Sequence, residues 1–193
     1  VPEGRIALPA LSPRDRSHLA FAVRRVDLVS ASFVRDPEDV DALREALAAH
    51  DAAHVAMVLK IETADAFAAL PELLLAALRH PGGVAVMVAR GDLAVEVGFE
   101  RLAEVQEEIL WLCEAAHVPV IWATQVLDAL TRDGTPTRAE VTDAAMAGRA
   151  ECVMLNKGPH VVEAVRFLSG VLERMHAHQR KKTAMLRALA VSG

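Results

Sequence analysis

The sequence predicts an α/β fold built on parallel strands, and two observations support this prediction. Short apolar runs begin near residues 27, 55, 84, 118 and 151, with helical patterns and no hairpin turns between them. Apolar runs of this kind are typical of strands buried on both faces of a parallel sheet. A repeat of about thirty residues is also the length of one β/α unit. Five such units fit a barrel or a doubly wound sheet, and periodicity does not choose between them.

The first two units begin with helix caps. The stretch Ser12–Asp15 combines a capping serine, a proline suited to the first helical position and an aspartate near the positive helix end. We expect this helix to end near Arg25 and the first strand to span Val26–Phe33. Asp36–Asp39 begins the second helix by the same logic.

The third unit is the one around which the chain is organised. We expect the second strand at Val55–Ile61 and helical sequence from Ala64 to Arg79, interrupted at Pro71. A buried strand then starts at Val84 and runs directly into Ala89–Asp92. Ligands bind at the carboxyl ends of parallel strands. The cation Arg90, the permissive Gly91 and the carboxylate Asp92 at this strand end would therefore suit an anionic ligand and a metal.

The rest of the chain continues the pattern. A capping box at Thr137–Glu140 opens one helix, and Gly158-Pro159 introduces a long helix that reaches Met175 or beyond. We predict one domain of β/α units over residues 1–175 and a C-terminal helical tail over residues 176–193. The remaining elements are expected at Phe99–Ala116 (helix), Val118–Thr124 (strand), 126–130 (short helical segment) and Glu151–Leu155 (strand).

Composition excludes several classes of protein. A net charge of −5 argues against a sequence-independent nucleic-acid binder, and the basic cluster Arg180–Lys182 is expected to be a solvated helix end. No apolar stretch approaches the roughly 20 residues that span a bilayer, and the N-terminus does not resemble a secretory signal. Cys113 and Cys152 are expected to be buried reduced thiols, and the eight histidines surface or capping residues. We therefore expect a cytoplasmic protein without nucleic-acid or membrane partners.

Polar groups gather at the ends of three successive strands. Lys60 and Glu62 are two residues apart on one strand, so their side chains share a face. Asp92 and Thr124 end the next two strands at the same level. Glu62 and Asp92 would suit a hard divalent cation such as Mg²⁺. A structural salt bridge between Lys60 and Glu62 explains the same residues without a ligand, and spacing alone leaves both interpretations open.

A family resemblance favours the first interpretation. The chain resembles pyruvate kinase in motifs that follow one another in the same order, up to about Val165. They are LPALSPRD at Leu8–Asp15, SASFVR at Ser30–Arg35, LKIE at Leu59–Glu62, MVARGDLAVE at Met87–Glu96, IWATQVLDAL at Ile121–Leu130, PTRAE at Pro136–Glu140 and CVML at Cys152–Leu155. The resemblance implies a TIM (β/α)₈ barrel, of which this chain would supply the later five of eight strands.

The resemblance also implies an activity: phosphoryl transfer between phosphoenolpyruvate and ADP, giving pyruvate and ATP. Lys60 matches the lysine that stabilises the transferring phosphoryl group, and Thr124 the threonine near the methyl carbon where enolpyruvate is protonated. Glu62 and Asp92 match the ligands of Mg²⁺ or Mn²⁺. The backbone at Ala89, Arg90, Gly91 and Asp92 matches the cradle of the substrate carboxylate, which leaves the Arg90 side chain to structure or to a subunit contact.

The chain departs from the family pattern in two ways: the loop expected near the nucleotide differs, and the first three barrel strands are missing. Asn156–His160 replaces the usual Ser-Gly-Glu-Thr loop, so Asn156 and Lys157 are only weak candidates for nucleotide binding. The resemblance implies a K⁺ site on residues absent from this chain, as are the lid and regulatory domains. Open sheet edges then predict a homo-oligomer or the remainder of a longer barrel. A Mg²⁺-dependent pyruvate-enolate aldolase or lyase, and a non-catalytic half-barrel for binding or assembly, are the alternatives.

Overall fold

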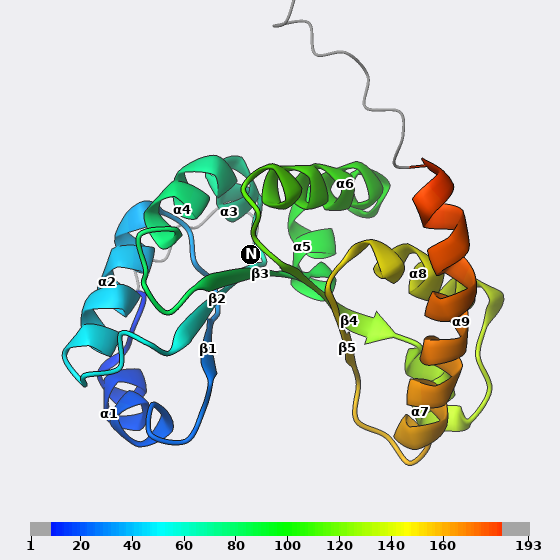
Figure 1. Ribbon diagram of the computed structural model, residues 1–193, viewed down its shortest axis with the longest axis horizontal. Helices are drawn as coiled ribbons and strands as arrows, with labels where there is room; N and C mark the ends of the chain where they lie inside the picture. The colour runs from blue at the N-terminus through cyan, green and yellow to red at the C-terminus, as the bar shows by residue number, and fades with distance from the viewer. Residues whose placement is uncertain (1–8, 183–193) are drawn as a thin grey trace, which may run out of the picture. The chain divides into compact units, whose positions relative to one another are not determined.

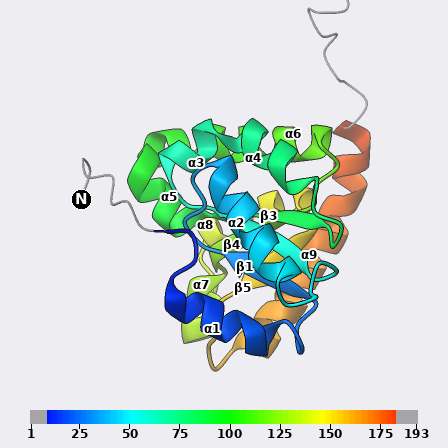
Figure 2. The same cartoon turned by 90° about the vertical axis from the view of Figure 1, so that its left-hand side faces the viewer.

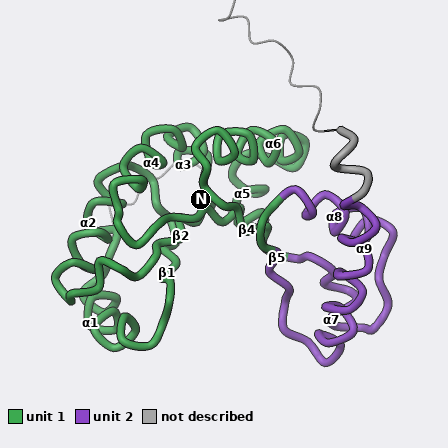
Figure 3. Tube along the Cα trace, in the orientation of Figure 1, with its two compact units in different colours: residues 1–124, 150–152 green, residues 125–149, 153–193 purple. Residues whose placement is uncertain are grey.

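The computed structural model describes residues 9–182, and for residues 177–182 it describes the backbone only. The chain forms two compact units (Figure 3). Unit 1 comprises residues 1–124 and 150–152, and unit 2 comprises residues 125–149 and 153–193. The predicted tail beyond Lys182 lies outside the described residues.

The elements alternate along the chain as the sequence predicts (Figure 1). In order they are α1 (Pro13–Ala22), β1 (Leu28–Ala31), α2 (Pro37–Ala48), β2 (Ala56–Ile61), α3 (Ala64–Ala68), α4 (Leu70–Ala77), β3 (Val84–Ala89), α5 (Arg90–Val97), α6 (Phe99–Ala115), β4 (Val120–Val126), α7 (Asp128–Asp133), α8 (Arg138–Met146), the short 3₁₀ helix η1 (Ala147–Arg149), β5 (Cys152–Leu155) and α9 (Val161–Lys182).

The five strands form a parallel sheet in chain order, β1-β2-β3-β4-β5, which confirms the predicted α/β class. Within unit 1, Lys60 pairs with Met87 and Ala89 with Ala123. This register brings the carboxyl ends of β2, β3 and β4 to one edge of the sheet. Residues that directly follow these strands therefore become neighbours.

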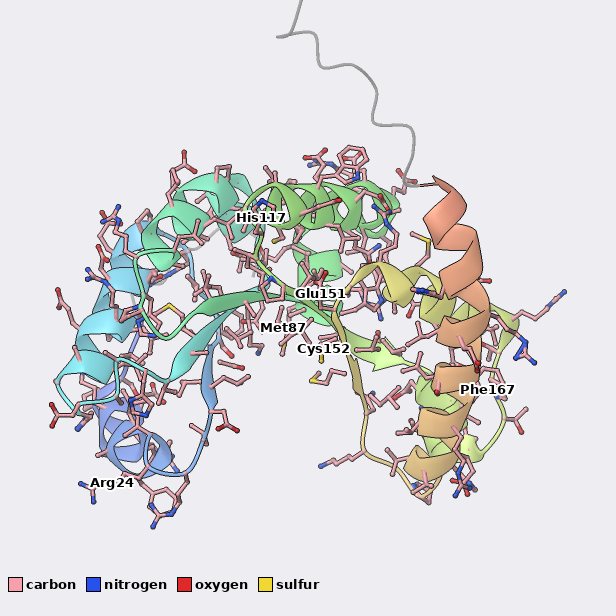
Figure 4. The ribbon with its side chains drawn as sticks, viewed as in Figure 1. Arg24, Met87, His117, Glu151, Cys152 and Phe167 are labelled. Atoms are coloured by element: carbon pink, nitrogen blue, oxygen red, sulfur yellow. The ribbon has the colours of Figure 1, made fainter. Side chains whose placement is uncertain are left out.

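The two faces of the strands in unit 1 have different surroundings. Figures 1 and 2 show α1 and α2 covering one face of β1 and β2, and α2 also packs on α4. Side chains on the opposite face of the sheet include Val58 and Ala123, which pack around Met87 (Figure 4). Lys60 lies on this second face, because it is two residues beyond Val58 on the same strand.

Helix starts agree with the predicted caps. The Ser12 side chain accepts a hydrogen bond from the Asp15 N–H and the Asp15 carboxylate accepts one from the Ser12 N–H, as a capping box requires. Those hydrogen bonds hold the pKa of Asp15 below its ordinary value. Thr137 and Glu140 form a second capping box at the start of α8. The expected helical interruption falls at Ala69, just before Pro71 in the first turn of α4.

Strand β4 differs from its predicted bounds. His117 adopts a left-handed conformation with φ of 55°, and the Val118 N–H still bonds to the Cys113 carbonyl, so both residues belong to the turn that ends α6. The strand accordingly starts at Val120 and runs to Val126. The Glu151 carboxylate accepts the Val120 N–H at 2.7 Å and so fixes this start.

The turn before β3 holds a buried histidine, where a surface or capping residue was expected. His80 is 4% exposed, and its Nε2 lies 2.7 Å from the Val55 carbonyl oxygen. Glycine is required two residues later, since a Cβ at Gly82 would lie 2.6 Å from the same oxygen. The turn is thus packed tightly against the start of β2, and the prediction was wrong for His80.

The two cysteines differ in exposure. Cys113 on α6 is buried as predicted, whereas the prediction was wrong for Cys152, which is exposed (Figure 4). Burial, with a smaller contribution from the Glu151 charge, raises the pKa of the Cys113 thiol from 9.0 to about 12. Because this pKa is raised on folding, the stability that the neutral thiol contributes is complete below about pH 9 and is lost as the pH rises towards 12.

Thiol labelling of the 193-residue chain should reflect this difference. Near pH 8 we expect Ellman's reagent to modify Cys152 in the native chain and Cys113 only after denaturation, because the thiolate is the reactive form. Mass spectrometry of labelled peptides identifies the modified residue. Labelling of Cys113 at a native rate equal to that of Cys152 would contradict the packing of α6.

Helices α7 and α8 of unit 2 both pack against α9, and small buried residues such as Ala144 and Ala164 allow close approach. α9 is continuous across Met175, up to Lys182. In the part of the chain that the structure describes, no helix is long and apolar enough to cross a membrane.

Candidate active site

An ion pair between a buried glutamate and a partly exposed lysine lies at the carboxyl end of β2. Glu62 directly follows the strand and is 2% exposed, and its Oε1 lies 2.7 Å from the Nζ of Lys60. The Lys60 Nζ also donates to the Ser32 hydroxyl at 2.8 Å. The second carboxylate oxygen of Glu62 accepts the Phe33 N–H at 2.6 Å. The turn after β1 therefore fixes both members of the pair.

This turn is conformationally unusual. Phe33 has a φ of 54°, in the left-handed region, and its side chain is exposed. Left-handed aromatic residues are uncommon, and a surrounding contact must hold them in place. The hydrogen bond from the Phe33 N–H to buried Glu62 supplies such a contact. The sequence predicted Lys60 and Glu62, but not the role of Ser32 and Phe33 in holding them.

Asp92 lies in the first turn of α5, immediately beyond β3. Its side chain is exposed and makes no hydrogen bond or ion pair with other residues among those described. Helix α5 starts without a side-chain cap. The positive end of the helix and its first backbone N–H groups thus lie beside Asp92, a setting that favours anions.

Thr124 follows Ala123, the β4 residue that pairs with the last residue of β3. Its hydroxyl oxygen accepts the Gly91 N–H at 2.9 Å. A Cβ at Gly91 would lie 3.7 Å from that oxygen, an ordinary contact, so packing against Thr124 does not by itself require glycine. The hydrogen bond joins the ends of β3 and β4.

The Arg90 side chain also joins these two strand ends. Its Nε donates to the Ala123 carbonyl at 2.9 Å and its Nη2 to the Thr124 carbonyl at 2.6 Å. The guanidinium carbon lies 4.8 Å from the ring centroid of buried Trp122. The side chain thus makes the structural contacts that were one of its two predicted roles.

The residues present fit a divalent cation with few protein ligands. No group of three or more His, Cys, Asp or Glu side chains suited to a metal occurs in the described ranges. Mg²⁺, however, is usually bound by one or two carboxylates together with substrate phosphates and water. Each Glu62 oxygen accepts one hydrogen bond and retains a lone pair, and the Asp92 carboxylate makes no hydrogen bond or ion pair with described residues.

The loop after β5 belongs to unit 2 and contains the two weak nucleotide candidates. Asn156 donates through Nδ2 to Asp128 Oδ1 at 2.6 Å, and Arg132 pairs with the other oxygen of Asp128 at 3.0 Å. Lys157 is exposed and makes no ion pair with described residues. The Asn156 amide is thus already used to hold the loop on α7.

Gly158 allows the loop after β5 to approach the backbone of α7 closely. A Cβ there would collide with the Thr131 carbonyl oxygen and lie 2.8 Å from the carbonyl carbon. The same carbonyl accepts the His160 N–H at 3.1 Å. Only glycine permits this approach, which places the loop between β5 and α9 directly against Thr131.

Substituting Gly158→Ala should destabilise unit 2 by about 1–3 kcal/mol, since backbone must move to relieve the overlap. Gly170→Ala in the middle of α9 is a matched control, because its nearest neighbour is 3.8 Å away and alanine favours helix by about 0.5–1 kcal/mol. Chemical denaturation measures both. Equal effects of the two substitutions would contradict the described packing of Gly158.

Comparison with known proteins identifies a family with the same kind of domain. A family model described as "Pyruvate kinase, barrel domain" matches residues 1–164. The chain belongs to the pyruvate kinase family. The match covers β1 to β5 and all the candidate residues in both units.

Individual pyruvate kinases show the extent of this relationship. The enzyme of Geobacillus stearothermophilus is 39% identical over 181 residues, covering 90% of this chain and 30% of that protein. The pyruvate kinase of Clostridium acetobutylicum is 36% identical, and the match covers 90% of this chain and 37% of that protein. Plastidial pyruvate kinase 3 of Arabidopsis thaliana is 35% identical, and the match covers 96% of this chain and 33% of that protein. The chain spans about a third of the length of these relatives.

Proposed function

We propose that the protein containing this chain transfers a phosphoryl group between phosphoenolpyruvate and ADP, giving pyruvate and ATP. The observation that supports this most strongly is in unit 1, where the Lys60–Glu62 pair, Asp92 and Thr124 lie near the carboxyl ends of three neighbouring parallel strands. Membership of the pyruvate kinase family supports the same reaction.

The proposed transfer assigns a role to each side chain. The bond between phosphorus and the enol oxygen breaks, and phosphorus bonds to a terminal oxygen of ADP. Lys60 would stabilise the charge on the moving phosphoryl group, and its Nζ is already held by Ser32 and Glu62. Preorganised positive charge of this kind is the main contribution that a protein makes to phosphoryl transfer. The remaining enolate takes a proton at its methylene carbon, where Thr124 would assist.

Glu62 and Asp92 would hold Mg²⁺ or Mn²⁺ in this proposal. The bound ion would supply positive charge at the phosphoryl and enolate oxygens. Glu62 would be oriented for this by its bond from the Phe33 N–H. The backbone of Ala89–Asp92, at the start of α5, would bind the substrate carboxylate. K⁺ would be bound through residues that this chain does not contain.

For the nucleotide, Lys157 is the better of the two candidates. It is exposed without an ion pair among the described residues, whereas the Asn156 amide donates to Asp128. We also propose a cytoplasmic location. The chain would associate with a second copy or with the rest of a longer barrel, because β1 and β5 are the edge strands of the sheet.

Phosphorus NMR of the full-length protein with phosphoenolpyruvate and ADP tests the proposal. We expect the ATP signals to grow only when Mg²⁺ or Mn²⁺ is present. Absence of transfer with ADP, GDP or UDP under these conditions would refute it. Calorimetry with ADP distinguishes the lyase alternative, since a pyruvate-enolate lyase needs no nucleotide.

A further inference from the structure

The end of β4 has a backbone conformation that needs support. Thr124 has a φ of 65° and Gln125 a φ of 55°, so two successive non-glycine residues are left-handed. This region is sterically unfavourable, and most of all for a β-branched residue such as threonine. Such residues persist only where surrounding contacts determine them.

Arg90 supplies those contacts from the neighbouring strand end. Its Nε and Nη2 bind the carbonyl oxygens of Ala123 and Thr124, at 2.9 and 2.6 Å. These two carbonyls belong to the peptide units on either side of the Thr124 Cα, so holding both fixes the φ and ψ angles of Thr124. The planar guanidinium matches two adjacent acceptors, which a lysine ammonium cannot do with the same geometry. The guanidinium also lies over the ring of buried Trp122, a cation–π contact that stabilises its position.

The next residue holds the side chain of Thr124. The Gly91 N–H donates to the threonine Oγ1 at 2.9 Å. Arg90 and Gly91 together therefore fix the backbone and the hydroxyl of one residue. Because Oγ1 accepts this bond, its own hydrogen remains available to donate in another direction.

We infer that Arg90 is a positioning residue for Thr124, which it holds in the left-handed conformation that sets the direction of the hydroxyl. Arg90 then acts on the reaction through Thr124 and not through the substrate. This role rests on the proposed function, because Thr124 matters to the chemistry only if an enolate is protonated there. The hydrogen bonds from Arg90 to the end of β4 do not depend on that function.

A double-mutant cycle in the full-length protein tests the inference. We expect Arg90→Met to lower kcat on the order of 10- to 100-fold, as misplacement of a reacting group does, with KM for phosphoenolpyruvate within about twofold. In a Thr124→Val background the same substitution should cost less than about twofold, because the positioned hydroxyl is already absent. Equal losses in both backgrounds, or a loss expressed only in KM, would overturn it.

Two further variants separate positioning from general stability. Arg90→Lys keeps the positive charge and most of the aliphatic chain, but it lacks the planar guanidinium that can donate to two carbonyls at once. We expect it to lower kcat nearly as much as Arg90→Met does. Arg101→Met is the matched control, since Arg101 pairs with Glu104 on the exposed face of α6 and should leave kcat unchanged. Full activity of Arg90→Lys would overturn the inference.

Hydrogen–deuterium exchange tests the same contacts without activity. In Arg90→Met we expect the Gly91 amide to exchange on the order of tenfold faster, while amides within β2 stay unchanged. Unchanged exchange at Gly91 would overturn the assignment. If the wild-type protein transfers no phosphoryl group, the proposed function fails, and the exchange still decides whether Arg90 holds Thr124.

Discussion

Replacing Lys60 with methionine is expected to lower kcat for phosphoryl transfer by on the order of 10³-fold, because a preorganised charge at the moving phosphoryl group is lost. Methionine keeps the length and apolar stem of the side chain. The loss should appear in kcat more than in KM for phosphoenolpyruvate, since the charge matters most in the transition state. Steady-state kinetics of the full-length protein with phosphoenolpyruvate and ADP measure both.

The same substitution removes the partner of a buried carboxylate. Glu62 is 2% exposed and would retain only the Phe33 N–H, so we expect destabilisation by about 3 kcal/mol, at the low end for buried pairs because Lys60 is itself 24% exposed. The double variant Lys60→Met with Glu62→Gln should recover most of the stability and none of the activity. Recovery of transfer in that variant would show that Lys60 acts through folding alone.

Substituting Asp92→Asn should have the second largest effect, and it should separate activity from stability. The Asp92 side chain is exposed and makes no hydrogen bond or ion pair with described residues, so the free energy of unfolding should change by less than about 0.5 kcal/mol. Loss of a proposed metal ligand should nevertheless lower kcat/KM at fixed Mg²⁺ by at least about 100-fold. Activity measured against Mg²⁺ concentration, together with a thermal melt, tests both statements.

Glu96 provides a matched control on the same helix. Glu96→Gln removes the same charge from α5, four residues further along and also at an exposed position. We expect it to leave the Mg²⁺ dependence unchanged. A similar response of Glu96→Gln and Asp92→Asn would mean that charge near α5 matters in general, and it would argue against Asp92 as a ligand.

The sequence predicts the order of elements because helix caps and apolar runs are local signals. Ser12, Asp36 and Thr137 cap their helices as predicted. Lys60 and Glu62 also share a face as their spacing requires, and they form an ion pair. This ion pair is the structural salt bridge that the spacing allowed as one of two interpretations. It does not exclude a site, since both groups lie at the edge where β2, β3 and β4 end.

Other features depend on contacts between distant parts of the chain and could not be predicted. The partners of the Lys60–Glu62 pair, Ser32 and Phe33, come from a turn about thirty residues earlier. Arg90 reaches carbonyl groups that belong to β4, where no side-chain pattern reveals an acceptor. The exposure of Cys152 likewise reflects the surroundings of β5 and not its apolar sequence.

Exchange of the methyl protons of pyruvate with deuterated water tests most directly whether these strand ends form one site. The full-length protein with Mg²⁺, K⁺ and inorganic phosphate is followed by proton NMR. The proposed site predicts exchange that requires the divalent ion and that falls at least about tenfold in Thr124→Val. Exchange no faster than with Mg²⁺ in buffer, or exchange unaffected by both Thr124→Val and Asp92→Asn, would contradict it.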